Sequence, residues 1–463
     1  MQNNFSKEEP EVLLNTAAEL IQKSGMDEFI AQYHSGYDWQ IRFSNSEQDI
    51  MKEWEIDKLE VFLVKDQRTT TLQIDIPTPT IIEKKLKEAS VFMKNSPPNQ
   101  LYAGMEQSIQ TPPSISSLFD SRTKDLVENG SENVYHAIDA ALAEGAKKVS
   151  GVLYFGSQIT SLRTSHGFSG EYAASYYRAT LRAFVGSESS GQDLLCGRNL
   201  DDFSTKMKNV GRNAGKIASM AVNPKTGIAG IYDVILSPTV GGNIFGEITD
   251  AANPLLTMLG MSPLQDKLGA QLGPESLTIR DNPLLGEGLN ARPFDVEGTP
   301  SQVTPLVENG KLINFVHNTS SAIQTGGKST GNSNFVDFGG GSQILAPFTS
   351  NIEYQPGDFS HEEIIAESKK PTIYITSNWY TRFTNMMEGT FSTIPRDGLF
   401  YVENGEIQYP IRNVRLSDNL LRMMKNIIQI GRDVQQVQWW EVRTPTFIPT
   451  IKVADCHITA PTK

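Results

Sequence analysis

The sequence has few of the features that mark several common protein classes. Its 463 residues include two cysteines, Cys196 and Cys456, far apart in the chain, so a reducing compartment fits better than a disulfide framework. No segment approaches the ~20 apolar residues that a membrane-spanning helix needs. The N-terminal stretch MQNNFSKEEP has neither the basic region nor the apolar core of a signal peptide. We therefore expect a cytoplasmic protein with no membrane partner.

Positive charge is scarce relative to negative charge. The chain has 41 lysines and arginines against 53 aspartates and glutamates, which gives a net charge of −12. The longest run of like charge, Glu83 to Lys87, is typical of a solvated helix face. Because a nucleic-acid surface needs a local excess of positive charge, we expect no nucleic-acid partner.

Complete catalytic motifs are also missing. His361 and Glu362 begin the zinc-protease pattern H-E-x-x-H, but Ile365 stands where the second histidine must share the helix face. Ser360 with Glu363 indicates a helix capping box instead. The six histidines show no spacing for joint metal ligation on one helix or strand, and there is no G-x-S-x-G elbow or kinase motif set.

Two glycine-rich segments invite an anion-binding interpretation. Gly326 to Asn332 contains Gly-Lys-Ser, but Ala322 occupies the place of the first glycine in a phosphate-binding loop. Our functional hypothesis for this segment is a loop that lines a polypeptide cleft. Gly339 to Gly341 could form a backbone nest for an anion, but no helix start with Lys-Ser/Thr follows, which favours a hinge or edge loop.

The apolar periodicity and the proline clusters divide the chain into three regions. Residues 1–110 are predicted to form an N-terminal α+β domain, residues 111–226 a central α+β domain, and residues 227–463 a β-rich C-terminal domain. In the first domain, a helix that begins with a capping box at Ser6 and ends at Gly25 should pack on short-stranded sheets. The expected short strands there are 27–33, 39–43, 59–65 and 70–76, followed by a helix over 81–93.

The second and third regions have different patterns. Helices are expected over 134–147 and 203–221, with two strands paired across Gly156 between them. In the third region, Asn309-Gly310 and Asn404-Gly405 each predict a two-residue hairpin turn. Further segments expected to be regular are a strand over 172–185 and helices within 254–272, 360–368 and 418–429. The predicted fold class is α+β, with a mostly antiparallel, barrel-like or sandwich C-terminal domain.

One stretch of the third region is typical of a site. Tyr232 to Leu236 predicts a buried strand, and Ser237-Pro238 then starts a helix through Gly241 and Gly242. A strand that delivers a helix start to a cleft is a common place for a metal or a nucleophile. This helix carries a carboxylate, Glu247, but no flanking histidine that could hold zinc.

Several longer motifs together carry a family resemblance. Their order and spacing match from about Gly227 to Val453, and Tyr102 to Gly104 and Thr164 to Phe168 fit more loosely. The motifs are ARPFDVEGT at 291–299, the hairpin at 309–310, GKSTGN at 327–332, GLFYVENGEIQYP at 398–410 and IGRD at 430–433. With these motifs the chain resembles the TldD/PmbA family, and in particular its PmbA branch, also called TldE.

The resemblance implies a role beside a zinc enzyme. The family is associated with a cytoplasmic metalloprotease of two homologous subunits, TldD and TldE, that trims unfolded peptides. TldD-type chains hold zinc with H-E-x-x-x-H and a later cysteine. Here that motif falls on Gly246 to Ala251, where Glu247 keeps the carboxylate and both histidines are replaced. The cysteine would fall around Trp440 to Thr444, where there is none.

The resemblance therefore implies a non-catalytic subunit. We expect no metal or other cofactor on this chain, zinc on a TldD-type partner in a heterodimer, and an unfolded peptide as substrate. A homodimer of this chain is the alternative to that heterodimer. The candidate cleft residues are Lys328, Ser329, Thr330, Gly331 and Asn332.

Two alternatives stay open. One is a self-contained metallopeptidase whose ligands come from distant segments, such as His166, His317 and Cys456. The other is a binding protein linked to DNA gyrase or to toxin-antitoxin turnover, which follows an older association of the PmbA branch. The acidic charge argues against direct binding to DNA in that case.

Overall fold

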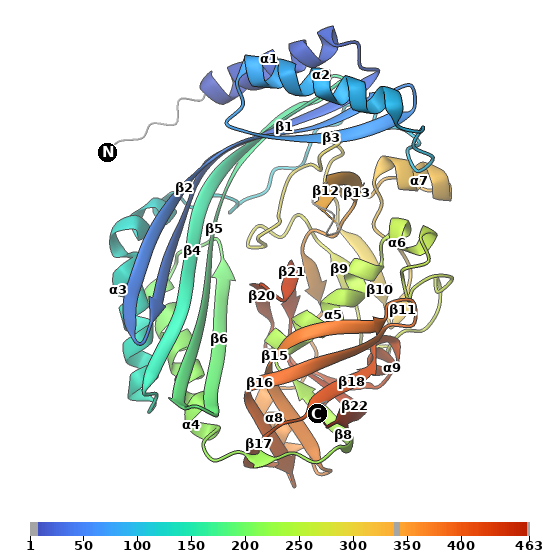
Figure 1. Cartoon of the computed structure of the whole chain (residues 1–463). Helices are drawn as coiled ribbons and strands as arrows, with labels where there is room; N and C mark the ends of the chain where they lie inside the picture. The colour runs from blue at the N-terminus through green and yellow to red at the C-terminus, as the bar shows by residue number, and fades with distance from the viewer. Residues whose placement is uncertain (1–7, 338–342, 461–463) are drawn as a thin grey trace.

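The computed structural model describes residues 8–337 and 343–460 and confirms the expected α+β class (Figure 1). A long, curved sheet with helices at both of its ends forms one side of the molecule, and the sheet-rich C-terminal half lies against it (Figure 1). No helix in these two ranges is long and apolar enough to cross a membrane.

The long sheet is six-stranded and antiparallel. Its order, β3-β2-β1-β4-β5-β6, joins strands from either side of residue 110, since β1 pairs with β4 from Ile30/Thr164 to Phe43/Gly151. The strands are β1 Glu28–Ser44, β2 Glu47–Lys65, β3 Arg68–Asp75, β4 Lys148–Thr164, β5 Ser169–Gly186 and β6 Ser189–Gly197.

These strands are longer than the sequence predicted. The expected runs 27–33 and 39–43 lie mostly within one strand, β1, and the hairpin predicted across Gly156 is wrong because β4 is continuous there. A Cβ atom on Gly36 would lie 2.1 Å from the Ser157 carbonyl oxygen, and one on Gly156 would lie 2.7 Å from the Tyr37 carbonyl oxygen. Both glycines therefore allow β1 and β4 to approach closely, and neither forms a turn.

Two pairs of helices cover the ends of this sheet (Figure 1). Leu14 and Ile21 of α1 and Leu86 of α2 are buried in one cluster with β1 and β2, as the apolar spacing predicted. Gly25 follows α1 with φ +77°, the conformation expected of a helix C-cap. The capping box predicted to begin at Ser6 starts outside the described residues. The helices are α1 Glu8–Lys23, α2 Pro79–Asn95, η1 Ser121–Asp125, α3 Leu126–Ala143 and α4 Phe203–Met220.

The C-terminal half is built from two larger sheets and a two-stranded ribbon. One sheet has the order β11-β10-β9-β14-β21-β20, and the ribbon pairs β12 with β13. Their strands are β9 Ile279–Asp281, β10 Thr304–Glu308, β11 Lys311–Leu312, β12 Ser333–Asp337, β13 Gln343–Pro347, β14 Ile352–Tyr354, β20 Gln435–Trp439 and β21 Val442–Ile448.

The other large sheet closes on itself in part. Its order is β15-β8-β22-β18-β16-β17-β7, and β15 also pairs with β16. Five of its strands therefore form a ring, which gives the barrel-like feature that the sequence suggested. The strands are β7 Lys225–Thr226, β8 Gly230–Leu236, β15 Thr372–Asn385, β16 Thr390–Glu403, β17 Glu406–Arg412, β18 Arg415–Asn419, β19 Ile427–Ile430 and β22 Ile451–Thr459.

The local signals of this half are mostly confirmed. Both Asn-Gly pairs form hairpin turns, between β10 and β11 and between β16 and β17. The Ser360 and Glu363 capping box is present, with the Ser360 amide donating to Glu363 at 2.6 Å. The helices are α5 Pro238–Ala251, α6 Pro254–Met258, α7 Thr319–Thr325, α8 His361–Ala366 and α9 Leu420–Lys425, so those expected within 254–272, 360–368 and 418–429 are short.

An ion pair with a buried carboxylate joins the long sheet to the ring. Asp397 of β16 has a fully buried side chain, and its Oδ1 accepts from Arg182 Nη2 at 2.6 Å and from Ser190 Oγ at 2.6 Å. Arg182 lies on β5 and Ser190 on β6, so both donors come from the long sheet. This pair fixes the C-terminal half against that sheet.

Candidate functional site

Helix α5 positions the candidate site. Strand β8 leads into Ser237, which caps the helix, and Pro238 occupies its first turn, as the sequence predicted. A Cβ atom on Gly241 would lie 3.1 Å from Ile448, and one on Gly242 would lie 3.3 Å from Val437. These glycines let α5 pack closely on β20 and β21, which brings the helix to the segment that joins those strands.

A cavity of about 210 Å³ lies where α5 meets that segment. It receives Asn243, Glu247 and Asp250 from one face of α5, as the spacing of about one helical turn requires. The complete described lining is Gly242, Asn243, Gly246, Glu247, Asp250, Thr381, Arg382, Trp440, Glu441, Val442, Arg443 and Thr444. The two segments to which the family resemblance assigns zinc ligands, 246–251 and 440–444, therefore meet at one place.

Glu247 is an acid with a strongly shifted pKa. Burial raises the pKa of Glu247 to about 7, the charge of Asp250 adds to that shift, and the charge of Arg443 opposes it. Burial also raises the pKa of Asp250, whose Oδ1 accepts from Thr444 at 3.1 Å and from Thr349 at 3.2 Å. A carboxyl with a pKa near 7 can carry or release a proton at neutral pH.

Glu441 is a third carboxylate in this cavity, which sequence reasoning missed. Its side chain is 4% exposed and accepts from the amides of Tyr380 at 3.0 Å and Thr381 at 3.2 Å and from Asn243 Nδ2 at 3.2 Å. Arg382 Nη1 lies 3.8 Å from it. These donors come from α5 and β15, far away in the sequence, so no local pattern could have revealed them.

The residues of this cavity do not fit zinc. Zinc sites in proteins use three or four histidine, cysteine or carboxylate donors, and no histidine or cysteine is among the described lining residues. Gly246 and Ala251 stand at the two histidine positions, and Arg382 and Arg443 add positive charge that disfavours a cation. Within 8–337 and 343–460, no group of three or more His, Cys, Asp or Glu side chains could hold a metal ion.

The ligand set of the alternative enzyme is not assembled either. His166 Nε2 contacts Glu28 at 2.8 Å at one end of the long sheet. His317 Nδ1 contacts Ser321 at 3.3 Å just before α7, and Cys456 is buried in β22. The described structure does not group them as metal ligands.

The proposed cleft loop, Lys328 to Asn332, folds back on the chain near α7. The Thr330 amide donates to the His317 carbonyl oxygen at 3.1 Å, and Ser329 Oγ donates to the same oxygen at 3.4 Å. Asn332 is completely buried and donates to Asp281. Gly331 has φ +73° at the turn of this loop, and Lys328 is exposed.

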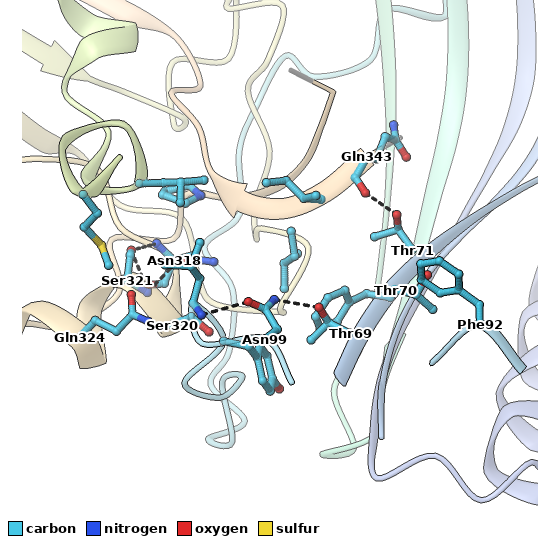
Figure 2. Close-up of a pocket in the computed structure, with 18 residues that line it drawn as sticks. Thr69, Thr70, Thr71, Phe92, Asn99, Asn318, Ser320, Ser321, Gln324 and Gln343 are labelled. Carbon is cyan, nitrogen blue, oxygen red and sulfur yellow. Dashed lines mark hydrogen bonds between the residues drawn. The ribbon is translucent and has the colours of Figure 1, made fainter. Parts of the chain in front are cut away.

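A larger cavity lies beside this loop and is lined instead by α7 and its neighbours. Its volume is about 400 Å³, and it lies between β3, the edge strand of the long sheet, and α7, with β13 also lining it (Figure 2). Asn318, Ser321 and Gln324 lie on one side, and Thr69 to Thr71 with Phe92 lie on the other (Figure 2). Thr71 Oγ1 donates to the Gln343 carbonyl oxygen, which bridges the two sides.

Family models match two parts of the chain. The PmbA/TldA metallopeptidase C-terminal domain matches residues 229–460, and the PmbA/TldA metallopeptidase central domain matches residues 122–222. The first of these ranges contains α5 and its cavity. The two matches therefore define the class of protein as a metallopeptidase scaffold. The chain belongs to the PmbA/TldD metallopeptidase family, as the resemblance predicted.

Curated relatives are similar over part of their length. A metalloprotease of Methanothermobacter thermautotrophicus is 29% identical over 228 residues, which are 49% of this chain and 48% of that protein. Metalloprotease PmbA of Escherichia coli O157:H7 is 27% identical over 276 residues, 58% of this chain and 57% of that protein. The matched region thus spans about half of the length of these relatives.

Solved structures share the fold over nearly the whole chain. TldE from Thermococcus kodakarensis is 18% identical, with a TM-score of 0.82 over 97% of this chain and 99% of that one. A Thermotoga maritima protein whose name refers to modulation of a DNA gyrase is 22% identical, with a TM-score of 0.82 over 97% of this chain and 100% of that one. At these identities the likeness shows the fold.

Proposed function

We propose that this chain is the non-catalytic subunit of a two-subunit, cytoplasmic metallopeptidase that trims unfolded peptides. In this proposal it shapes the substrate cleft for a zinc-bearing partner of TldD type. The observation that carries the proposal is the cavity at Glu247. The two segments that hold zinc in TldD-type chains meet there, but Gly246 and Ala251 replace the histidines, and there is no cysteine within 440–444.

The cavity beside α7 supports a peptide-binding part in this role. An extended peptide can add to the edge of a sheet through main-chain hydrogen bonds that do not depend on its sequence, and β3 is such an edge. Amide and hydroxyl side chains on the facing wall can bond to a peptide backbone. We place the substrate cleft along this edge, with Lys328 to Asn332 at its border.

A reconstitution assay tests the division of labour. The purified chain is mixed with a TldD-type partner, and cleavage of an unstructured peptide is followed. We expect the mixture to cleave much faster than either chain alone. Glu247→Gln in this chain should leave that rate within about twofold, whereas the same change at the motif glutamate of the partner should abolish it.

Two results would contradict the proposal. Equal cleavage by the partner alone would remove the role of this chain. Loss of activity with Glu247→Gln, together with one zinc ion per purified chain by elemental analysis, would instead favour a self-contained enzyme.

A further inference from the structure

A third cavity, of about 310 Å³, lies between the long sheet and the C-terminal half. One wall is β5, which contributes Arg178, and the opposite wall is the loop that follows β9, which contributes Arg292. Arg198, just after β6, lines it as well. Three arginines thus line one polar cavity in a chain with a net charge of −12.

Arg198 is held rigidly without a neutralising partner. It is 3% exposed, and its guanidinium donates to the carbonyl oxygens of Ser175 at 2.6 Å, Leu289 at 2.8 Å, Gly288 at 2.9 Å and Leu118 at 3.2 Å. In the described ranges no carboxylate lies within salt-bridge distance of it. It joins the two halves through these bonds, and the charge of Glu287 acts on it only from beyond salt-bridge distance.

Arg178 and Arg292 have no such structural role. Neither side chain donates a hydrogen bond to, or lies within 4 Å of, a carboxylate in the part of the chain that the structure describes. Arg178 stacks on Tyr154, with 5.4 Å between guanidinium and ring. Nε and Nη2 of Arg292 are buried without an acceptor. Buried guanidinium nitrogens without acceptors, such as these two of Arg292, are unfavourable, and an anion would relieve that cost.

The acidic groups nearby are engaged elsewhere. Asp38 lines the cavity and accepts from the Tyr176 hydroxyl at 2.9 Å. Asp281 accepts from Asn332 and from the Ser350 amide at 2.7 Å. Asp295, the other carboxylate near Arg292, accepts from backbone amides, which include that of Ser333 at 2.9 Å. Arg178 acts on Asp38, and Arg292 acts on Asp281 and Asp295, through charge alone. The cavity therefore presents guanidinium donors that form no direct hydrogen bond with its carboxylates.

We propose that this cavity binds an oxyanion, a carboxylate or a phosphate group, between Arg178 and Arg292, with the fixed charge of Arg198 beside it. Thr349 lines this cavity and also bonds to Asp250 in the Glu247 cavity, so the two cavities adjoin. If the proposed function holds, the C-terminal carboxylate of a bound peptide is the source that fits this position. Only the identification of the oxyanion as a peptide C-terminal carboxylate rests on the proposed function.

Calorimetric titration of the isolated full chain at pH 8 tests the site. The probes are an unstructured hexapeptide with a free C-terminal carboxylate, the same peptide with a C-terminal amide, and inorganic phosphate. We expect the free acid to bind at least tenfold more tightly than the amide. Arg178→Gln should weaken binding about tenfold or more through loss of a charge-assisted hydrogen bond, and Asp38→Asn should strengthen it.

Controls separate this effect from misfolding and from net charge. Arg212→Gln, on the exposed face of α4, removes the same charge and should leave the affinity unchanged. Thermal unfolding checks that Arg178→Gln is folded, and Arg292→Gln provides a second variant.

If inorganic phosphate binds and the same arginine substitutions weaken its binding, the result supports the oxyanion site and identifies phosphate as the anion that it binds. The proposal is overturned if no probe binds, or if binding is indifferent to both Arg178→Gln and Arg292→Gln. Because the titration needs neither partner nor cleavage, its failure is distinct from failure of the proposed function.

Discussion

Three carboxyl groups in the α5 cavity are held by different means. Glu441 accepts from two backbone amides and lies near Arg382, whereas Glu247 is partly buried and its pKa is raised to about 7. Asp250 accepts from two threonines, and burial raises its pKa. Because Glu247 has less compensation, its protonation couples to the stability of the fold.

A glutamate with a raised pKa stabilises the folded state only while it is protonated. From its ordinary value of 4.5 up to about 7, folded Glu247 keeps a proton that the unfolded chain releases, so its contribution to stability falls as the pH rises. Glu247→Gln removes this penalty. We expect the variant to gain on the order of 2 to 3 kcal/mol relative to the wild type between pH 5 and pH 8.

Urea unfolding at the two pH values measures this difference. Glu83→Gln, an exposed change on α2, should show no such trend. A constant difference between Glu247→Gln and the wild type across this range would contradict the assigned burial.

The sequence could locate part of this site. Glu247 and the segment 440–444 follow from the family motif, and the structure brings them together. Glu441 and its donors on β15 could not be predicted, because they meet only through the packing of α5 on β20 and β21. The arginine-lined cavity was missed for the same reason, since Arg178 and Arg292 lie on different halves of the molecule.

At the level of strands and helices, signals that depend on backbone conformation were reliable. Asn309 and Asn404 have φ +49° and +55°, and each is followed by a glycine of positive φ, as a two-residue hairpin turn requires. Gly156 within β4 was misread as a turn, because the sequence does not distinguish a glycine that allows close strand approach from one that forms a turn. Only the neighbouring strand distinguishes the two.

Substitution of Gly156 tests that explanation. A Cβ atom there meets the Tyr37 carbonyl oxygen and Asp38 Oδ1, at 2.7 and 2.2 Å, so Gly156→Ala should destabilise the fold by about 1 to 3 kcal/mol. Gly186→Ala is the matched control, because a Cβ atom at that end of β5 meets nothing within 4 Å. Denaturant unfolding of both variants decides the matter, and equal stabilities would contradict close approach of β1 and β4.

For the whole molecule, the contact between the long sheet and the ring depends on a buried charge. Asp397 takes all of its described donors from Arg182 and Ser190 of the long sheet. Asp397→Asn leaves the Arg182 guanidinium, which is 26% exposed, without a counter-charge. We expect a cost of about 1 to 3 kcal/mol, below the value of about 3 to 5 kcal/mol typical of a fully buried pair.

We expect Asp397→Asn to loosen the two halves before either unfolds. Hydrogen exchange should show faster exchange at β5, β6 and β16, and calorimetry should show a broader or divided transition. Arg212→Gln, which removes an exposed charge on α4, should change neither measurement. A single, unshifted transition in Asp397→Asn would contradict this role of the ion pair.

The pairing of β1 with β4 has a consequence for synthesis on the ribosome. Gly36 pairs with Gln158, about 120 positions later, so β1 has an open edge until β4 emerges. At a synthesis rate of about 5–20 residues per second, roughly 6 to 24 s pass between the synthesis of Gly36 and that of Gln158. During that interval the nascent chain exposes an unpaired strand to aggregation, and a chaperone that shields residues 28–44 would raise the yield of native protein.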